Sequence, residues 1–401
     1  MLIDRERAAD EMARAGLDAL IAATPENVVY ASGFESLGQS LIPGVRVFAV
    51  VPKDPAHPVA VVAPVGELDR AAESAEAMEG KFYPYGAFFY DPGEGAGGDE
   101  DGANLRRLVL GGAPAPSAAG ALREAMGSLG AAGSGVVGLD EKGLDAPGFA
   151  TVSEALSQCQ VEPAYETFRR VRRIKTAEEV RRLRRAVEIS EEAVQEVLSE
   201  AREGMTEREM AEVYECVLIR RGARPSLTVI GVGPHSAFPN GRPSDRALRP
   251  GDLIRFDVGC RVLGYHADIA RTAVLGDPAR RQEEVYAALL AGHLAALDRV
   301  RAGTPAREVF RTAVSTVRES GLPRYERHHV GHGIGVELYE PPILNELEGR
   351  PLEAGMVVNV EPPYYEIGFG GFQVEDTVLV TEDGFKCFNR MPKGMISVRG
   401  A

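Results

Sequence analysis

The sequence predicts an α+β protein of two domains, a smaller α/β domain over residues 1–160 and a larger domain over residues 161–401. Its 401 residues exceed the length that a single hydrophobic core usually serves. Charge is also unevenly placed, because residues 1–160 carry 11 basic and 23 acidic side chains, against 34 and 36 in the remainder. Apolar runs of strand length alternate with helical patterns throughout. Together, these observations predict the boundary and the mixed fold.

Three apolar runs in the first domain predict buried strands, at residues 17–24, 45–52 and 57–64. Helical patterns lie between them, as expected for an α/β layer. The segment 169–185 follows the boundary and carries nine positive charges. We interpret it as a linker and solvated helix face that packs on the acidic first domain, with a nucleic-acid or partner surface as the alternative.

Paired helices followed by strands are predicted twice in the second domain. Thr176 with Glu179, and Thr206 with Glu209, have the spacing of capping boxes and predict where the first two helices begin. The predicted helices cover residues 176–202, 206–222, 278–301 and 305–320. The predicted strands lie near residues 226–232, 252–259, 266–274, 325–330, 356–361 and 372–380.

Composition excludes several classes of protein. The formal net charge of −14 disfavours a broad phosphate-binding surface, so we expect no nucleic-acid partner. The N-terminus is charged, and no run approaches the roughly 18 apolar residues of a membrane-spanning helix. The four cysteines are far apart and form no CxxC pair, as expected in a reducing compartment. We therefore predict a cytoplasmic protein without a membrane partner.

Two aspartates mark the first concentration of chemistry, in the segment RFDVGCRVLGYHADIART. If residues 262 and 263 form the tip of a hairpin that contains Gly264, then Asp257 and Asp268 face each other directly across its strands. Two close carboxylates cannot both stay ionised cheaply in a low-dielectric site. They require a shared proton or a cation, and this segment alone leaves both choices open.

Two glutamates form a similar pair in VNVEPPYYEIGFGGFQVEDT, where Glu361 and Glu375 lie on a predicted hairpin centred near Gly368. Four carboxylates at one place would repel each other strongly, whereas two divalent cations would neutralise them. This arrangement therefore favours a metal site over a proton-sharing dyad.

A histidine-rich segment, HHVGHGIG, adds His328, His329 and His332 beside glycines that permit close backbone approach. An imidazole among carboxylates suits Mn, Fe, Co or Zn better than Mg or Ca. The ordered set of two Asp, one His and two Glu is far more specific than any of its parts. The sequence thus predicts a transition-metal centre.

These motifs resemble the catalytic domain of the Xaa-Pro dipeptidase, aminopeptidase P and creatinase family, a domain whose fold is called pita-bread. Residues 1–160 resemble the smaller N-terminal domain of the same family, so the resemblance covers essentially the whole chain. It implies two divalent metal ions (Mn, Co, Fe or Zn), a small-molecule or dipeptide substrate, and a homodimer.

The resemblance also implies a role for each ligand. By analogy, Asp257 chelates one ion, Asp268 and Glu375 bridge the pair, and His332 with Glu361 holds the second ion. In the family's peptidases, a metal-bridging hydroxide attacks the scissile carbonyl. Glu361 would accept its proton, which makes Glu361 a catalytic residue as well as a ligand.

Two positions depart from the family pattern. Tyr339, in GHGIGVELYE, stands where the family has a proton-shuttling His, and Asn240, in AFPNGRPSD, stands where it has a second His. A tyrosine has a reference pKa near 10 and relays protons poorly at neutral pH, and an Asn transfers none. We predict that both contact the substrate and take part in catalysis, and that His266 and His328 are further substrate contacts.

The leading hypothesis is therefore a dinuclear metallohydrolase of the Xaa-Pro dipeptidase type. One alternative keeps the fold but acts as a metal-dependent lyase or hydrolase on a small non-peptide zwitterion, with Tyr339 and a carboxylate as acid and base. Another is a non-catalytic pita-bread binding protein. Retention of all five ligands counts against the latter, because a scaffold has no need for them.

Overall fold

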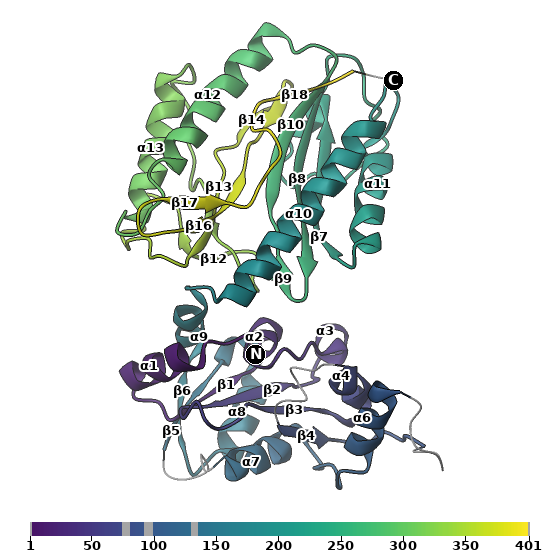
Figure 1. The fold of residues 1–401 in the computed structure, drawn as a ribbon, viewed down its shortest axis with the longest axis vertical. Helices are drawn as coiled ribbons and strands as arrows, with labels where there is room; N and C mark the ends of the chain where they lie inside the picture. The colour runs from purple at the N-terminus through teal and green to yellow at the C-terminus, as the bar shows by residue number, and fades with distance from the viewer. Residues whose placement is uncertain (1, 74–80, 92–98, 130–134, 400–401) are drawn as a thin grey trace. The chain divides into compact units, whose positions relative to one another are not determined.

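The computed structural model describes residues 2–73, 81–91, 99–129 and 135–399. The chain divides into two compact units, Met1–Arg172 and Arg173–Ala401 (Figure 1). Residues 1, 74–80, 92–98, 130–134 and 400–401 lie outside the described residues.

A six-stranded sheet of order β4-β3-β2-β1-β5-β6 forms the centre of the first unit. The three predicted strands are confirmed as β1, β2 and β3, which pair antiparallel, whereas the outer pairs β3–β4, β1–β5 and β5–β6 are parallel. The other strands were not predicted. Strands β4 and β6 are partly exposed and each contains a proline, so neither forms a long apolar run. The strands are β1 (Ala19–Ala22), β2 (Phe48–Pro52), β3 (Ala60–Pro64), β4 (Lys81–Tyr85), β5 (Val136–Leu139) and β6 (Gln160–Pro163).

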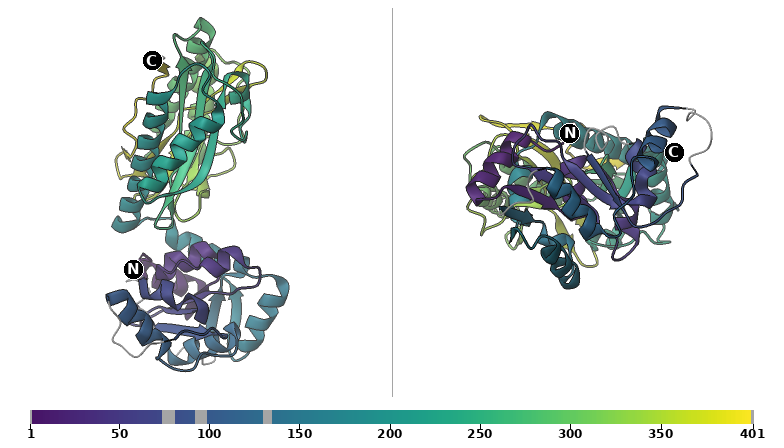
Figure 2. Two further views of the ribbon diagram at one scale, coloured as in Figure 1. Left: turned by 90° about the vertical axis from the view of Figure 1, so that its right-hand side faces the viewer. Right: turned by 90° about the horizontal axis from the view of Figure 1, so that it is seen from below.

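Helices cover this sheet and close its core. Leu122 and Met126 of α7 pack with Ile21, Phe48 and Val50 of the central strands in one buried apolar cluster. Figure 2 shows the helices on both sides of the strands. The helices are α1 (Arg5–Ala15), α2 (Pro25–Ser32), α3 (Leu37–Leu41), α4 (Leu68–Glu73), α6 (Glu100–Val109), α7 (Ala118–Ser128), α8 (Ala146–Ala155) and α9 (Tyr165–Arg172).

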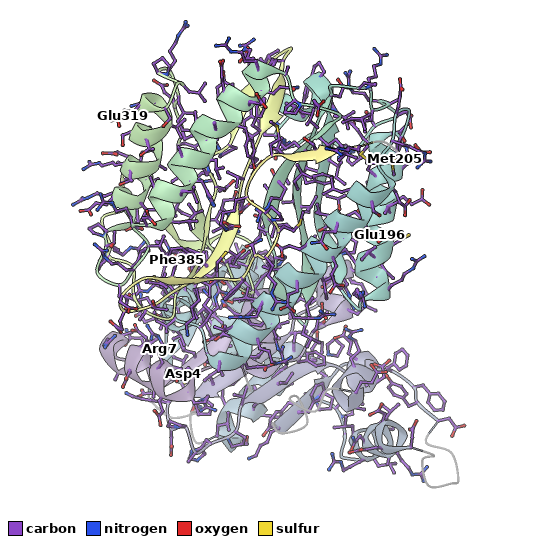
Figure 3. The ribbon with its side chains drawn as sticks, turned by 45° about the horizontal axis from the view of Figure 1, so that its top comes forward. Asp4, Arg7, Glu196, Met205, Glu319 and Phe385 are labelled. Atoms are coloured by element: carbon purple, nitrogen blue, oxygen red, sulfur yellow. The ribbon has the colours of Figure 1, made fainter. Side chains whose placement is uncertain are left out.

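Four long helices of the second unit confirm the predicted ones. The Thr176 and Thr206 hydroxyls accept from the backbone N–H groups of Glu179 and Glu209, and both glutamates reach back to the cap residue, so both capping boxes are present. Figure 3 labels Glu196 on α10 and Met205 in the connection to α11, away from Glu319 at the end of α13. The helices are α10 (Ala177–Glu200), α11 (Glu207–Arg220), α12 (Arg280–Leu297) and α13 (Ala306–Glu319).

Two five-stranded sheets lie between these helix pairs. One has the order β18-β10-β8-β7, with β9 paired to β8, and the other has the order β12-β11-β13-β16-β17. A separate ribbon joins β14 to β15. The strands are β7 (Arg224–Val232), β8 (Leu253–Val262), β9 (Tyr265–His266), β10 (Ile269–Leu275), β11 (His332–Gly333), β12 (Glu340–Ile343), β13 (Val357–Val360), β14 (Tyr364–Glu366), β15 (Gly370–Phe372), β16 (Asp376–Val380), β17 (Phe385–Cys387) and β18 (Ile396–Val398).

The prediction of a strand at residues 325–330 is wrong, because these residues form no strand. Val330 donates to the carbonyl of Leu344 and accepts from the backbone of Glu361, each at 2.9 Å, but these bonds form no ladder. Gly331 then takes a φ of 144°, which interrupts an extended run before β11 begins.

The two helix pairs cover different strands. Helices α10 and α11 pack on β8 and β7, as the ribbon shows, whereas α12 and α13 pack on each other and on the sheet of β13 and β16 (Figures 1 and 2). Leu289 and Val309 share a buried cluster with Val358 and Val378. No helix among the described residues is long and apolar enough to cross a membrane.

Candidate metal centre

The first acidic hairpin is formed by β8 and β10, but its register differs from the predicted one. Asp257 pairs with Ala270, and not with Asp268, because the tip lies at Leu263 and Gly264 rather than at residues 262 and 263. Asp268 is therefore a diagonal neighbour two residues away. Side chains two residues apart on a strand share a face, so both carboxylates still point to one side.

The second acidic hairpin has the predicted register. Val360 pairs with Asp376 in β13–β16, and Glu366 pairs with Gly370 in β14–β15, so both ladders are centred on Gly368. Glu361 and Glu375 occupy the gap between these two ladders. The N–H of Glu375 donates to the carbonyl of Ala270 at 3.1 Å, which joins this hairpin to the first.

The two hairpins bring ligand atoms together in the interior. One ligand atom from each of Asp268, His332 and Glu375 lies within 4.8 Å of the others, and all three residues are buried. The Nε2 atom of His332 is 3.6 Å from Asp268 and 3.7 Å from Glu361 Oε1. Four of the five predicted ligands therefore meet at one point, beside the partly buried Asp257.

Each of these four side chains keeps one buried atom without a hydrogen-bond partner among the described residues. Such orphaned atoms are rare in proteins, because a buried polar group without a partner costs about 1–3 kcal/mol. Their clustering fits a divalent cation that would bind all of them. The atoms are Asp268 Oδ1, His332 Nε2, Glu361 Oε1 and Glu375 Oε2.

Local backbone geometry aims His332 at the carboxylates. Its Nδ1 lies 2.9 Å from the carbonyl of Gly333, a contact that places the proton on Nδ1 and leaves the Nε2 lone pair free. Gly331 allows the close approach, since a Cβ at that position would collide with the carbonyl of Asn359. A glycine is therefore required at this position of HHVGHGIG, because a larger residue would not fit beside the carbonyl of Asn359.

Burial and mutual repulsion favour the protonated forms of the carboxylates. Burial raises the pKa of Glu361 to about 8, with His332 opposing and Asp268 adding to the rise. Burial also raises the pKa of Asp257 to about 6, although Arg255 opposes it. The pKa of Glu375 is raised for the same reasons, first burial and then the charge of Asp268. A cation would reverse these shifts.

A buried arginine that the sequence reasoning missed holds Asp257. The Arg255 side chain is fully buried and uses all five of its N–H donors, at distances of 2.7–3.2 Å. It therefore ties a candidate ligand to the segment just before Asn240. The acceptors are the backbone carbonyls of Ser236, Phe238 and Pro239, the Asp257 carboxylate and the Gln373 side-chain carbonyl.

Two amide side chains orient the glutamates. The Gln373 amide donates to Glu361 Oε2 at 3.2 Å, and the Asn359 amide donates to Glu375 Oε1 at 2.8 Å. Each glutamate thus has one oxygen held by an amide and one oxygen free for a cation. Such outer contacts fix the direction of metal ligands.

Tyr339, a predicted substrate contact, lies against the candidate ligand His332. Its ring stacks on His332 with centroids 3.6 Å apart, and 46% of the residue is exposed. Burial, followed by the charges of Glu361 and Asp268, raises the pKa of its phenol above the usual value. Tyr339 therefore stays protonated and can donate a hydrogen bond to a substrate, but it cannot act as a base.

The other predicted substrate contacts lie on three different segments. Asn240 is exposed in the segment after η3 (Gly233–Ala237), and His328 is exposed with its ring centroid 4.3 Å from that of His329. His266 is half-buried in β9, and its Nδ1 has no partner among the described residues. His266 does not belong to the group of three within 4.8 Å.

His329 is closer to the centre than the sequence indicated. Its Nδ1 is 3.6 Å from Glu361 Oε1 and accepts from the N–H of Gly331 at 3.3 Å. The ring meets that of Tyr339 edge-on, with centroids 5.9 Å apart. It lay within the predicted HHVGHGIG motif, but neighbouring positions on an irregular backbone carry no periodicity that would show which one turns inward.

Comparison with known proteins assigns both units. Residues 181–382 match the family model described as Metallopeptidase family M24, and residues 5–174 match the Creatinase/Prolidase N-terminal domain. The chain is a metallohydrolase with a creatinase-type N-terminal unit and a pita-bread catalytic unit. It belongs to metallopeptidase family M24.

Curated relatives and solved structures agree with this assignment. Over 233 residues, the chain is 35% identical to an Xaa-Pro dipeptidase of Pyrococcus furiosus, a match that covers 58% of this chain and 67% of the relative. The corresponding enzyme of Pyrococcus horikoshii is 34% identical, with 58% and 66% covered. The aligned part thus spans about two thirds of these relatives.

The structural matches extend over nearly the whole chain. A prolidase from Pyrococcus furiosus superimposes with a TM-score of 0.74 and 27% identity, covering 96% of this chain and 99% of that one. Dipeptidase PepE from Mycobacterium ulcerans gives a TM-score of 0.76 and 26% identity, with 98% and 97% covered. These comparisons favour the predicted peptidase over the lyase and scaffold alternatives.

Proposed function

We propose that this protein is a dinuclear metallopeptidase that cleaves Xaa-Pro dipeptides. The observation that carries the proposal is the buried set of four orphaned ligand atoms at the meeting point of two acidic hairpins. Asp257 would hold one divalent ion, Asp268 and Glu375 would help to hold both ions, and His332 with Glu361 would hold the second ion. The donor set suits Mn, Co, Fe or Zn.

The side chains around the ligands supply the remaining chemistry. Such ions, when bound, acidify water and polarise the scissile carbonyl. Gln373 orients Glu361 through Oε2 and leaves Oε1 directed at the ions, so Glu361 would accept the proton of the attacking water beside them. Tyr339 can donate a hydrogen bond to the developing oxyanion, because its phenol stays protonated.

Turnover of a dipeptide panel tests this function. Purified protein reconstituted with Mn, Co, Fe or Zn is expected to cleave Xaa-Pro dipeptides roughly 10- to 100-fold more efficiently than dipeptides without proline. Tyr339→Phe keeps the ring against His332 but removes the hydroxyl, so we expect it to lower kcat and to leave metal content unchanged. A fully metallated protein that cleaves no Xaa-Pro dipeptide would contradict the proposal.

Metal affinity is expected to rise with pH. The pKa of Glu361, raised to about 8, means that the metal-free site holds a proton at pH 6.5, and a cation must displace it. Asp257, with its pKa raised to about 6, is mostly ionised at that pH. For each proton released, affinity increases about tenfold per pH unit until the carboxylates are ionised, above about pH 8. Titration calorimetry with Mn²⁺ at pH 6.5 and 8.5, in buffers of different ionisation enthalpy, measures the affinity and the number of protons released.

Glu361→Gln is the matched variant for this measurement. It retains a side-chain carbonyl but binds no titratable proton, so it should release about one proton fewer at pH 6.5. An affinity that is flat between pH 6.5 and 8.5, without proton release, would show that the carboxylates are already ionised in the metal-free protein.

A further inference from the structure

Two guanidinium groups lie over one aromatic ring at the edge of the candidate metal centre. The central carbon of Arg255 is 5.2 Å from the centroid of Tyr365, and that of Arg327 is 5.6 Å from it. Both distances lie within the roughly 6 Å range of cation–π contacts. The two arginines share this neighbour but differ in every other contact.

Arg255 has no capacity left for a ligand. Its five donors are all taken by protein oxygens, and its side chain is fully buried. Arg255 is therefore a structural cation that holds Asp257 and Gln373 in place.

Arg327 shows the opposite pattern. Among the residues that the structure describes, it makes no hydrogen bond or ion pair, and its Nε is buried without a partner. The residue is only partly buried, so the rest of the guanidinium can be reached from outside. An arginine packed on a ring loses side-chain freedom, and that loss is not offset here by any hydrogen bond within the protein.

Arg327 is also close to the reacting groups. It precedes His332 by five residues, and its ring partner Tyr365 donates to Gln373 at 3.3 Å, which in turn donates to Glu361. Burial and then His332 have larger effects on the pKa of Glu361, but the positive charge of Arg327 also contributes by lowering it. The unpaired cation therefore lies within electrostatic range of the residue proposed to accept the proton.

We propose that Arg327 binds the free carboxylate of the substrate and thereby selects dipeptides over longer peptides. The inference rests on the proposed function, and it concerns a residue that contacts the substrate and no metal. A guanidinium matches a carboxylate through two parallel N–H···O bonds, and that of Arg327 lies over the Tyr365 ring. A dipeptide has its only free carboxylate one residue from the scissile bond, whereas a longer peptide has an amide there.

A comparison of acids with amides tests this role. The Mn²⁺-loaded protein and its Arg327→Gln variant would be assayed with Ala-Pro and with Ala-Pro amide, which differ only in the carboxylate. We expect Arg327→Gln to lower kcat/KM for Ala-Pro by about 10- to 100-fold, the usual effect of a lost charged hydrogen bond, and to leave the amide within about twofold. Arg327→Lys should recover part of the loss, since it keeps the charge but not the fork.

Arg324→Gln is the matched control, because it makes the same change at an exposed position in the same segment. Arg324→Gln should leave kcat/KM unchanged for both substrates. If Arg327→Gln weakens acid and amide equally, Arg327 serves only to offset the charge of Glu361, and the proposal is wrong. No effect on either substrate would overturn it as well.

A binding measurement separates this inference from the proposed function. L-proline and L-prolinamide are not cleaved, so their calorimetric titration into the Mn²⁺-loaded protein needs no turnover. Tighter binding of proline than of prolinamide, with the difference abolished in Arg327→Gln, supports the inference even if no dipeptide is cleaved. Equal binding of the two by the unmodified protein would refute it, whatever the outcome of the dipeptide panel.

Discussion

Glu375→Gln is expected to abolish activity and to remove at least one metal ion. Glu375 is proposed to bridge both ions, and its free oxygen lies in the group formed with Asp268 and His332. The change replaces an anionic oxygen with a neutral amide and keeps the volume of the side chain. We expect kcat/KM to fall by at least about 10²–10³-fold and metal content to fall below that of the unmodified protein.

The metal-free variant should nevertheless be no less stable than the metal-free parent. Burial raises the pKa of Glu375, which shows that its charge is costly in the empty site, and a neutral amide avoids this cost. Metal analysis and thermal unfolding with and without Mn²⁺ measure both effects. Glu382→Gln makes the same change at an exposed residue in the turn after β16 and should behave like the parent. Unchanged metal content in Glu375→Gln would contradict the proposed centre.

Most of the helices and strands of the second unit could be predicted from the sequence, because they depend on local signals. Helices α10 and α11 begin at capping boxes that involve residues three positions apart. The second acidic hairpin was placed correctly because Gly368, at its centre, has a φ of 82° and marks the turn.

The register of the first hairpin could not be predicted in the same way. Its turn places Leu263 at a φ of 47°, followed by Gly264 at 88°, and a positive φ is costly for leucine. The predicted tip at residues 262 and 263 also contains Leu263, so this cost does not distinguish the two registers. A tertiary contact supports the actual turn, since Arg182 donates to the carbonyl of Leu263 at 3.0 Å from α10, 81 residues away in the chain.

The residues that orient the proposed ligands were also missed, although the sequence contains a signal for them. Each lies two positions before a carboxylate, and residues with this spacing share one face of a strand. His266 has the same spacing before Asp268, yet its side chain lies outside the cluster of ligand atoms. Spacing alone therefore does not show which side chains make contacts, since these depend on long-range packing. The spacing holds for Arg255 before Asp257, Asn359 before Glu361 and Gln373 before Glu375. Only Arg255 bonds to the carboxylate that it precedes, whereas Asn359 donates to Glu375 and Gln373 donates to Glu361.

Arg255→Met is expected to weaken metal binding although Arg255 touches no metal. The change removes five hydrogen bonds and leaves Asp257 without its cationic partner. We expect the affinity for Mn²⁺ to fall by about 10- to 100-fold, as is usual when the support of a metal ligand is lost. The free energy of unfolding should fall by about 3–5 kcal/mol, because buried partners are left unpaired.

Arg255→Lys separates the two effects if the methionine variant does not fold. A lysine retains the charge beside Asp257 but cannot reach the five acceptors, so it should bind Mn²⁺ with intermediate affinity and keep most of the fold. Arg249→Met, at an exposed position before β8, controls for the loss of an arginine.

Mn²⁺ affinity equal to that of the parent in a folded Arg255 variant would show that the metal ligands hold their geometry without this support. Parallel loss of affinity and of the Asn240 segment's protection from hydrogen exchange would instead show that Arg255 couples that segment to the metal centre.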